Sequence, residues 1–525
     1  MNYGHFTKDG GEYVITRPDT PTPWINYISN SLGYCGIVSQ TGGGFSFIGD
    51  PRERRITKYR YNAVPVDRPG RYVYIRDDET GVYWSPTWQP VARPLEKYNC
   101  RHGLGYTRIT SVCEGIESEI TYFVPRTDTC EVWHLSLKNT GDRARRLSLF
   151  PYCEFTLWSE PESRNIQWSL HLTRCHFEQG LILYRFIEPH PAFSVEENSG
   201  YDPERPGFAF MGINTDVESY ECARDSFIGV YRSENAPAAV ENGRLSSTRL
   251  EGGIACAALH TTMSLALGEE NELIVTTGFA ESTDTALLMR GLYSDPANTR
   301  RELAAVKKGW KEFLSPFVLD APHTDVTRNV NVWNPYQCKT TFDWSRYISF
   351  YENGEGRGMG TRDSCQDALA VCPFMPEHVA DRICEIISAC QFENGSCYHQ
   401  YFPLGRKGEL AGFSDDHLWL ILMVYHYITE TGDFDFLLRE VSWAASVRSA
   451  SVYRHLLAAF DYTGRTTGPH GLPLIGVADW NDTLHLFHES RKPESVFVAC
   501  LYVYAGKLLA ALAEKARKEG DARLL

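Results

Sequence analysis

Two carboxylates beside a tryptophan are the first residues of this sequence whose types and spacing could do chemistry. Asp479 and Asp482 flank Trp480 and Asn481 within the run 476–482. A glycosidic oxygen leaves when a carboxylic acid protonates it, and an indole face offers an apolar platform for a pyranose ring. The run therefore predicts a sugar-cleaving site. The structural alternative is an Asx turn that caps the following helix.

A glycine-rich cluster upstream supplies the second set of candidate residues. Residues 354–367 hold four alternating glycines, two arginines and two aspartates. The glycines exclude a stable helix at 354–360 and let the backbone approach a ligand closely, and the charged side chains suit a polyhydroxylated or anionic ligand. Arg346 precedes Arg357 in the chain, and its planar guanidinium can hold a phosphate by two parallel hydrogen bonds. A surface loop with ion pairs is the alternative.

Together these segments resemble the inverting β-glucoside phosphorylases of glycoside hydrolase family 94. That family includes cellobiose, cellodextrin, laminaribiose and chitobiose phosphorylases. The resemblance extends over the whole chain and does not depend on one motif. The segments that carry it are 3–6, 12–18, 23–27, 43–47, 101–106, 398–401, 415–421 and 468–476.

The resemblance implies roles for five residues. Asp482 falls on the general acid of the family, and Trp480 falls on an aromatic side chain that lines the donor-sugar subsite. Arg357 and Asp363 fall on the residues that hold the hydroxyl groups of the same sugar. Arg346 matches the phosphate-binding arginine.

The implied reaction is the reversible phosphorolysis of a β-linked glucosyl disaccharide, carried out by a hexosyltransferase with inversion. Phosphate is already an anionic nucleophile, so arginines replace the base with which an inverting hydrolase activates water. Asp482 must carry a proton when the disaccharide or oligosaccharide binds, whereas Asp479 has no catalytic counterpart and is expected to stabilise the turn. The expected products are α-glucose 1-phosphate and a released sugar. Phosphate is the co-substrate, and no cofactor or metal ion is expected.

Two other functions stay open. An inverting glycoside hydrolase on the same barrel would need a second catalytic carboxylate, and a non-catalytic carbohydrate-binding protein would need none. The acceptor is also open between cellobiose, cellodextrin, laminaribiose and chitobiose, because Trp168 stands where cellobiose-specific relatives tend to carry an arginine. Trp168 stacks on a sugar or belongs to the sandwich core. His399 is interpreted as a hydrogen-bonded structural residue.

Composition predicts a cytoplasmic protein that binds neither nucleic acid nor membrane. The 52 basic and 66 acidic residues give a net charge of -14, which suits a neutral sugar substrate. Residues 1–9 carry no apolar signal core, and the longest apolar run, 418–425, is too short to cross a bilayer. The 15 cysteines include no C-x-x-C pair and are expected to be buried free thiols. The resemblance adds the expectation of a homodimer.

The elements that position these residues are expected to form several domains, because 525 residues exceed what one hydrophobic core supports. Short alternating segments predict an antiparallel β-sandwich over 1–280, with a hairpin turn at 139–142. A period of 3.6 residues predicts a helical linker over 281–316. Uninterrupted helical patterns follow, and with the resemblance they indicate a partial (α/α)6 barrel over 317–525.

Three helices of this barrel have clear sequence signals. One can start at Pro376, another runs from an N-cap at Ser414 to a stop near Gly432, and a third lies around 496–513. The family's barrel would bring the glycine cluster and Asp482 to one end of its helix pairs. Twelve helices with their loops need on the order of 300 residues, more than follow 316. The sequence therefore looks truncated, and the chain alone is expected to be inactive or barely active.

Overall fold

The structure is a computed structural model that describes eight stretches of the chain. They are residues 3–51, 54–60, 67–157, 172–186, 207–344, 357–403, 407–483 and 492–518. The chain forms two compact units, Met1–Glu312 and Phe313–Leu525. The predicted division at 280 and 316 remains a prediction.

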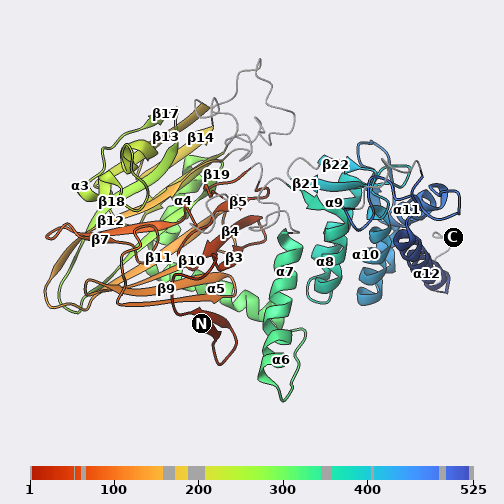
Figure 1. The fold of residues 1–525 in the computed structure, drawn as a ribbon, viewed down its shortest axis with the longest axis horizontal. Helices are drawn as coiled ribbons and strands as arrows, with labels where there is room; N and C mark the ends of the chain where they lie inside the picture. The colour runs from red at the N-terminus through yellow and green to blue at the C-terminus, as the bar shows by residue number, and fades with distance from the viewer. Residues whose placement is uncertain are drawn as a thin grey trace. The chain divides into compact units, whose positions relative to one another are not determined.

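The first unit is built on antiparallel sheets (Figure 1). In order across the larger sheet, its strands are β1 (Gly4–Phe6), β2 (Glu12–Ile15), β8 (Lys97–Gly103), β9 (Tyr106–Cys113), β10 (Ile116–Phe123), β11 (Cys130–Asn139), β19 (Glu270–Ala280), β15 (Phe208–Ile213), β14 (Leu181–Phe186), β13 (Thr173–Glu178) and β17 (Leu250–Glu251). A second sheet has β16 (Ser219–Ala223), β18 (Ala255–Leu265), β12 (Arg145–Glu154), β6 (Tyr72–Asp77) and β7 (Tyr83–Trp84). A small sheet holds β3 (Ile25–Ser29), β4 (Tyr34–Ser39) and β5 (Ser46–Ile48).

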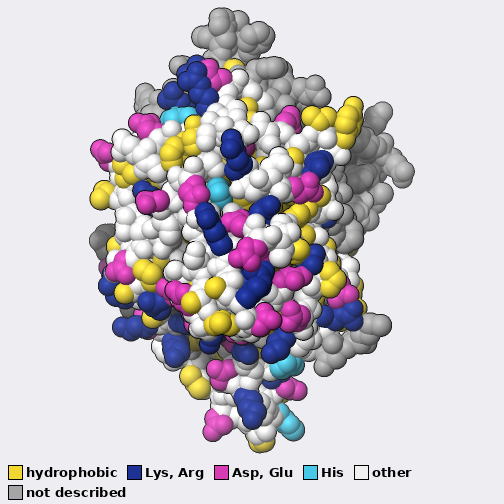
Figure 2. Space-filling model, turned by 90° about the vertical axis from the view of Figure 1, so that its left-hand side faces the viewer, with side chains coloured by type: hydrophobic (Ala, Val, Ile, Leu, Met, Phe, Trp, Pro, Cys, Tyr) yellow, Lys and Arg dark blue, Asp and Glu magenta, His cyan; other side chains and the backbone are white. Residues whose placement is uncertain are grey.

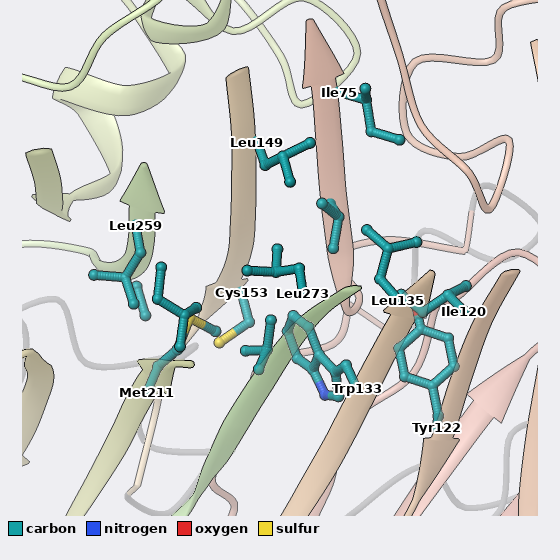
Figure 3. Packing of buried hydrophobic residues seen from close by; sticks show 14 of the residues in the cluster. Ile75, Ile120, Tyr122, Trp133, Leu135, Leu149, Cys153, Met211, Leu259 and Leu273 are labelled. Carbon is teal, nitrogen blue, oxygen red and sulfur yellow. The ribbon is translucent and has the colours of Figure 1, made fainter. Parts of the chain in front are cut away.

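The two main sheets share one hydrophobic core, which confirms the predicted sandwich. Trp133 of β11 and Leu273 of β19 come from the larger sheet, whereas Leu149 of β12 and Leu259 of β18 come from the second sheet (Figure 3). All four side chains are fully buried. Side chains alternate between the two faces of each strand, so the inward residues of both sheets meet in a single layer.

The predicted hairpin at 139–142 is wrong. β11 pairs with β10 and β19 in the larger sheet, whereas β12 pairs with β6 and β18 in the second sheet. The connection therefore passes from one sheet to the other. The leucines on either side of this turn are buried, as strand alternation predicts: Leu135, Leu137, Leu147 and Leu149. Alternation shows that a strand has an inward face, but it does not show which sheet the strand joins.

The helices predicted as a linker pack against the larger sheet. They are α4 (Thr283–Ser294) and α5 (Pro296–Leu314). Met289, Tyr293 and Val306 share a hydrophobic cluster with Phe123 of β10 and Phe210 of β15. Most of the predicted linker is therefore part of the first unit's core.

The surface of the first unit carries mixed charge. Two short helices, α2 (Arg224–Ile228) and α3 (Ala238–Asn242), cover part of the second sheet, and they share a cluster with its tyrosines and phenylalanine. On the face shown in Figure 2, basic and acidic side chains are interspersed and hydrophobic side chains are scattered.

The second unit is mainly helical. Its helices are α6 (Thr324–Arg328), a π-helical turn η3 (Asn329–Trp333), α7 (Asn334–Trp344), α8 (Thr361–Val371), α9 (Pro376–Cys390), α10 (Asp416–Thr431), a 3-10 turn η4 (Phe434–Leu438), α11 (Val452–Arg465) and α12 (Val496–Lys518). Its strands are β20 (Met359–Gly360), β21 (Tyr398–Phe402), β22 (Lys407–Ala411), β23 (Glu440–Ser442) and β24 (Ser449–Ser451). In Figure 1, α8, α9 and α10 lie side by side with β21 and β22 at one end.

Several predicted element boundaries hold and others need correction. α9 starts at Pro376, and α10 stops at Gly432, whose φ of 73° is left-handed. The N-cap of α10 is Asp415 rather than Ser414, because the Ser414 hydroxyl donates to the Ala478 carbonyl instead. The strands β20 to β24 interrupt the helices, contrary to the prediction. These strands are only two to five residues long, so they show no clear alternation beside the longer helical patterns on either side.

The described part of the glycine cluster agrees with the predicted exclusion of a helix. Its described glycines, Gly358 and Gly360, lie outside helices, as expected, but α8 starts at Thr361 and includes the rest of the cluster. Gly360 serves as the N-cap of that helix. A non-helical glycine can precede a helix without weakening it.

Among the described residues, α12 is the single helix that is long and apolar enough, by length and composition, to cross a membrane. In this structure 33% of its apolar stretch is buried. The run 418–425 is therefore not the longest apolar run of the sequence, because residues 496–505 of α12 form a longer one. Core helices of globular proteins satisfy the same test, so the result is weak evidence for a membrane segment.

Candidate active site

The candidate site is built around Arg362 at the start of α8. Its Nε lies 3.2 Å from Asp415 Oδ2 and 3.8 Å from Asp416 Oδ1, at the start of α10. Trp419 Nε1, one turn into α10, also donates to Asp415 Oδ2 at 3.0 Å. Both aspartates are fully buried. The N-terminal ends of two helices thus meet at one arginine, and acidic side chains suit such ends because the helix dipole is positive there.

The other two nitrogens of Arg362 hold the Asp-Trp-Asn-Asp segment. Nη1 donates to the carbonyl of Trp480 at 2.6 Å, and Nη2 donates to Asp482 Oδ1 at 3.0 Å. The Arg362 side chain is 6% exposed, whereas that of Asp482 is 50% exposed. The guanidinium therefore connects a buried acid pair to an acid that faces solvent.

The Trp480 ring is available at the same surface. It is 51% exposed, and its centroid lies 6.0 Å from that of Phe497, in the first turn of α12. An indole exposed to this extent keeps a free face on which an apolar sugar face can stack. The arrangement fits the predicted platform beside the candidate acid.

Asp479 stabilises the turn, as predicted. Its Oδ1 accepts a hydrogen bond from the Asn481 amide at 2.9 Å, which is an Asx turn. Its Oδ2 accepts from the Ser495 hydroxyl at 2.6 Å, and the Ser495 hydroxyl accepts from the Val498 amide at 3.1 Å. Asp479 is 5% exposed. The buried aspartate thus anchors the segment to the start of α12.

Backbone contacts hold the beginning of the same segment. Val477 donates its amide hydrogen to the Gly412 carbonyl at 2.9 Å. Gly476 has a φ of 64°, and a Cβ atom there would lie 2.2 Å from the Gly412 carbonyl oxygen. Only glycine fits this close approach, so the segment lies against the chain that follows β22.

Arg357 and Asp363 form an ion pair at the same end of α8. Arg357 Nη2 lies 3.0 Å from Asp363 Oδ2, and both side chains are partly exposed. Asp363 follows Arg362 directly in the first turn of the helix. A Cβ atom on Gly360 would lie 2.4 Å from Asp363 Oδ2, so the glycine leaves the room that this carboxylate occupies.

Burial and like charge set the protonation of the acid pair. Burial, followed by the negative charge of Asp416, raises the pKa of Asp415 to about 7, although Arg362 and Trp419 oppose this rise. Burial also raises the pKa of Asp416, against the opposing effects of His399 and Arg362. For Arg362, burial acts to lower the pKa, but the charges of Asp415 and Asp416, together with the hydrogen bond and charge of Asp482, raise that pKa.

His399 has the structural surroundings predicted for it. Its Nδ1 lies 3.0 Å from Asp416 Oδ2, and its ring stacks on that of Phe413 at 3.9 Å between centroids. The His399 side chain is buried. It therefore supports the acid pair from the side of β21.

The structure brings four of the five predicted site residues to one end of α8. Asp482 and Trp480 are bonded to Arg362, and Asp363, which binds Arg357, is its neighbour in the helix. Arg346 and Trp168 lie outside the described residues. The roles of the five residues remain predictions. Within the described residues, no group of three or more His, Cys, Asp or Glu side chains could hold a metal ion.

Sequence reasoning missed the role of Arg362 and of the acid pair. Arg362 was visible only as one charge in the glycine cluster, and its partner Asp482 lies 120 residues away in the chain. The sequence does place Asp415 and Asp416 directly before the apolar run of α10. Adjacent acids at the start of a buried helix are a signal for a buried cationic partner.

Two family models match this chain. The glycosyl hydrolase 94 supersandwich domain matches residues 11–296, which is more than half of the chain. The catalytic domain of the glycosyl hydrolase 94 superfamily matches residues 309–524. The first match covers the sheet unit, and the second covers the helical unit that holds the candidate site.

Individual relatives match over nearly the whole chain. An N,N'-diacetylchitobiose phosphorylase from Vibrio proteolyticus is 35% identical over 99% of this chain and 66% of its own length. A 3-O-beta-D-glucopyranosyl-beta-D-glucuronide phosphorylase from Paenibacillus borealis is 31% identical over 98% of this chain and 63% of its own length. The chain thus spans slightly less than two thirds of the length of these relatives.

A solved structure supports the fold. A bacterial glucoamylase complexed with acarbose has a TM-score of 0.50 and 9% identity, over 87% of this chain and 60% of that chain. At this identity the likeness concerns the fold alone, and it agrees with the predicted combination of a sheet domain and an (α/α)6 type of helical domain. Because the first family model covers more than half of its residues, the chain belongs to the glycosyl hydrolase 94 family.

Proposed function

We propose that this chain provides the catalytic site of a phosphorylase that cleaves a β-linked disaccharide with phosphate and inverts the anomeric centre. Asp482 donates a proton to the departing sugar oxygen, and phosphate attacks the anomeric carbon from the opposite face. Trp480, Arg357 and Asp363 hold the donor sugar, and Arg346 binds phosphate. The products are an α-sugar 1-phosphate and a free sugar, and no cofactor takes part.

One observation carries this proposal. An exposed carboxyl, Asp482, is held by an arginine beside a half-exposed tryptophan, within the unit that matches the family's catalytic domain. A proton donor must be fixed relative to the bond that it cleaves, and a sugar ring needs an apolar face to stack on. Asp482 and Trp480 meet both requirements.

The two buried acids are excluded as the base that an inverting hydrolase would need. An inverting hydrolase needs a second carboxylate that faces the water on the far side of the sugar ring. Asp415 and Asp416 have no exposed surface and are engaged with Arg362, so neither can serve as that base. Asp363 is paired with Arg357. A nucleophile that arrives already ionised needs no such base.

The finer points of the proposal rest on resemblance and composition. The donor is a glucosyl or 2-acetamido-glucosyl unit, as the names of the two relatives suggest. We place the enzyme in the cytoplasm as a homodimer, on its acidic composition and on the family resemblance.

The test is a phosphate-dependence assay on a panel of disaccharides. Cellobiose, laminaribiose and N,N'-diacetylchitobiose are incubated with the protein, with and without phosphate, and α-sugar 1-phosphate is measured. We expect product from at least one disaccharide only when phosphate is present. Free sugar formed without phosphate would show a hydrolase, and binding without turnover would show a carbohydrate-binding protein.

A further inference from the structure

We infer that Arg362 is a positioning residue for Asp482, and that the two buried aspartates at the start of α10 offset the positive charge that Arg362 presents to Asp482. This inference rests on the proposed function. It assigns a task to three residues to which the resemblance gave none. It also explains how an acid that must donate a proton can sit on an arginine.

The positioning follows from the shape of the guanidinium. A planar fork fixes two partners at once, and here these are the Trp480 carbonyl and the Asp482 carboxyl. The fork itself is fixed because Arg362 is buried and its Nε faces Asp415. A rotation of either bonded partner would break one of the two hydrogen bonds. Arg362 thus holds the segment at two points, the backbone of Trp480 and the side chain of Asp482.

Charge balance is the second part of the argument. A carboxyl beside a lone guanidinium is held in its ionised form, which cannot donate a proton. Arg362 does not act as a lone cation, because two buried carboxyl groups lie within 3.8 Å of its Nε. Each of them that is ionised cancels positive charge that Asp482 would otherwise meet. The rise in the pKa of Asp415 to about 7 fits a cluster with an excess of acid.

The remaining groups around the cluster contribute little positive charge. The titratable and charged side chains that face it, among the described residues, are Asp363 and Cys365 of α8, Cys390 of α9, Cys397, His399 of β21 and Asp482. Burial raises the pKa of each of the three thiols, so they stay neutral. Two other described groups at this end of α8 can carry positive charge: His399, which faces Asp416 rather than Asp482, and Arg357, which is paired with Asp363.

The positioning role is tested by hydrogen exchange over residues 476–483 of the full chain. In Arg362→Gln we expect the amides of this segment to exchange at least about tenfold faster, because both contacts of the fork are lost. Arg362→Lys, which keeps the charge and loses the fork, should give an intermediate increase. Arg382→Gln is the matched control, since Arg382 is also largely buried and donates to a carbonyl, that of Phe342. Unchanged exchange in Arg362→Gln would overturn the positioning role.

Charge balance is tested by the pH dependence of phosphorolysis. Asp415→Asn keeps the shape and removes a negative charge, so we expect the alkaline limb of the pH–rate profile to move about one pH unit lower. A purely structural role would lower the rate equally at all pH values and leave the limb in place, and that result would overturn the charge-balance role. Asp381→Asn, on the exposed face of α9, controls for loss of one acid.

The two arms separate this inference from the proposed function. If the wild-type protein forms no sugar phosphate, the proposed function fails. Hydrogen exchange needs no turnover and then still decides whether Arg362 holds the Asp482 segment. If the wild-type protein is active and neither variant behaves as expected, the inference fails and the proposed function stands.

Discussion

At the residue scale, the buried acids Asp415 and Asp416 share the arginine that holds the exposed Asp482. Asp482 has an ordinary ion-pair distance to Arg362, yet that arginine already faces Asp415 and Asp416. Exposed ion pairs contribute little to stability, whereas buried charges must be compensated. The free-energy cost of burying charge therefore falls on Asp415 and Asp416, whereas the Asp482 side chain is half-exposed and can reach a substrate.

Stability should therefore depend on pH through Asp415. Its pKa in the folded protein is raised to about 7 from 3.8, so the folded state binds the proton more tightly than the unfolded state. This contribution is complete below about pH 3.8 and is lost as the pH rises through about 7. Asn does not titrate, so the free energy of unfolding of Asp415→Asn, relative to wild type, should rise by about 2 kcal/mol from pH 5 to pH 8.

Urea unfolding at four pH values between 5 and 8 checks this expectation. Asp381→Asn removes an exposed acid from α9 and serves as the control, for which the difference from wild type should stay flat. A flat difference for Asp415→Asn as well would show that Asp415 is ionised throughout this range.

The sequence alone was enough to propose only some of the residues in this cluster. Asp482 and Trp480 could be proposed because proton donation and sugar stacking require their residue types at close spacing. Arg362 could not be assigned, because its contact with Asp482 depends on how two distant segments fold together. Local pattern carries no information on such a pair.

At the element scale, the starts of three helices position the site. α8 carries Arg362 and Asp363, α10 begins with the acid pair, and α12 is capped by Ser495, which binds Asp479. Helix ends leave unpaired amide groups, and side chains from other segments satisfy them. The Asp479–Asp482 segment is thereby fixed from α8 and from α12.

The cap of α12 should matter for the site as well as for the helix. Ser495→Ala removes the acceptor for the Val498 amide and the donor to Asp479. We expect the free energy of unfolding to fall by about 1–2 kcal/mol. Trp480 should also become more accessible to acrylamide, and Trp480→Phe identifies its share of the fluorescence.

Ser282→Ala is the matched control for that experiment. Ser282 caps α4 in the other unit, and its hydroxyl accepts from the Thr285 amide at 3.1 Å. Ser282→Ala should lower the free energy of unfolding by about 1 kcal/mol and leave the acrylamide quenching of Trp480 unchanged. Equal quenching changes in both variants would mean that Ser495 does not hold the segment.

Element prediction succeeded where one local signal dominates. Pro376 fixes φ in the first turn of α9, and Gly432 adopts without strain the left-handed φ that ends α10, so each boundary follows from one residue. It failed at 139–142, where the partner of β12 is chosen by long-range packing. It also failed for the short strands, which contain too few residues to show a period.

At the scale of the whole molecule, the exposed face of α12 stands out. Val496, Phe497, Val503 and Tyr504 are between 45% and 67% exposed and recur at helical spacing. Exposed apolar stripes favour association in water. The homodimer predicted from the resemblance has a direct test here.

A charge in the stripe should reduce association and leave the fold intact. Val503 is 58% exposed, so Val503→Lys should change the free energy of unfolding by less than about 0.5 kcal/mol. In sedimentation velocity it should shift the protein toward monomer. Val447→Lys is the control, because Val447 is fully exposed and belongs to the connection between β23 and β24 rather than to α12. A loss of stability without a change in association would show that the stripe is covered within one chain.

The most direct test of the central claim compares phosphorolysis by the wild-type protein, Asp482→Asn and Asp479→Asn. We expect the Asp482 variant to form sugar 1-phosphate at least about 100-fold more slowly while it unfolds like the wild-type protein. The Asp479 variant, which loses an anchor and no proton donor, should be less stable but retain most of its rate at low temperature. Wild-type activity in Asp482→Asn would contradict the account.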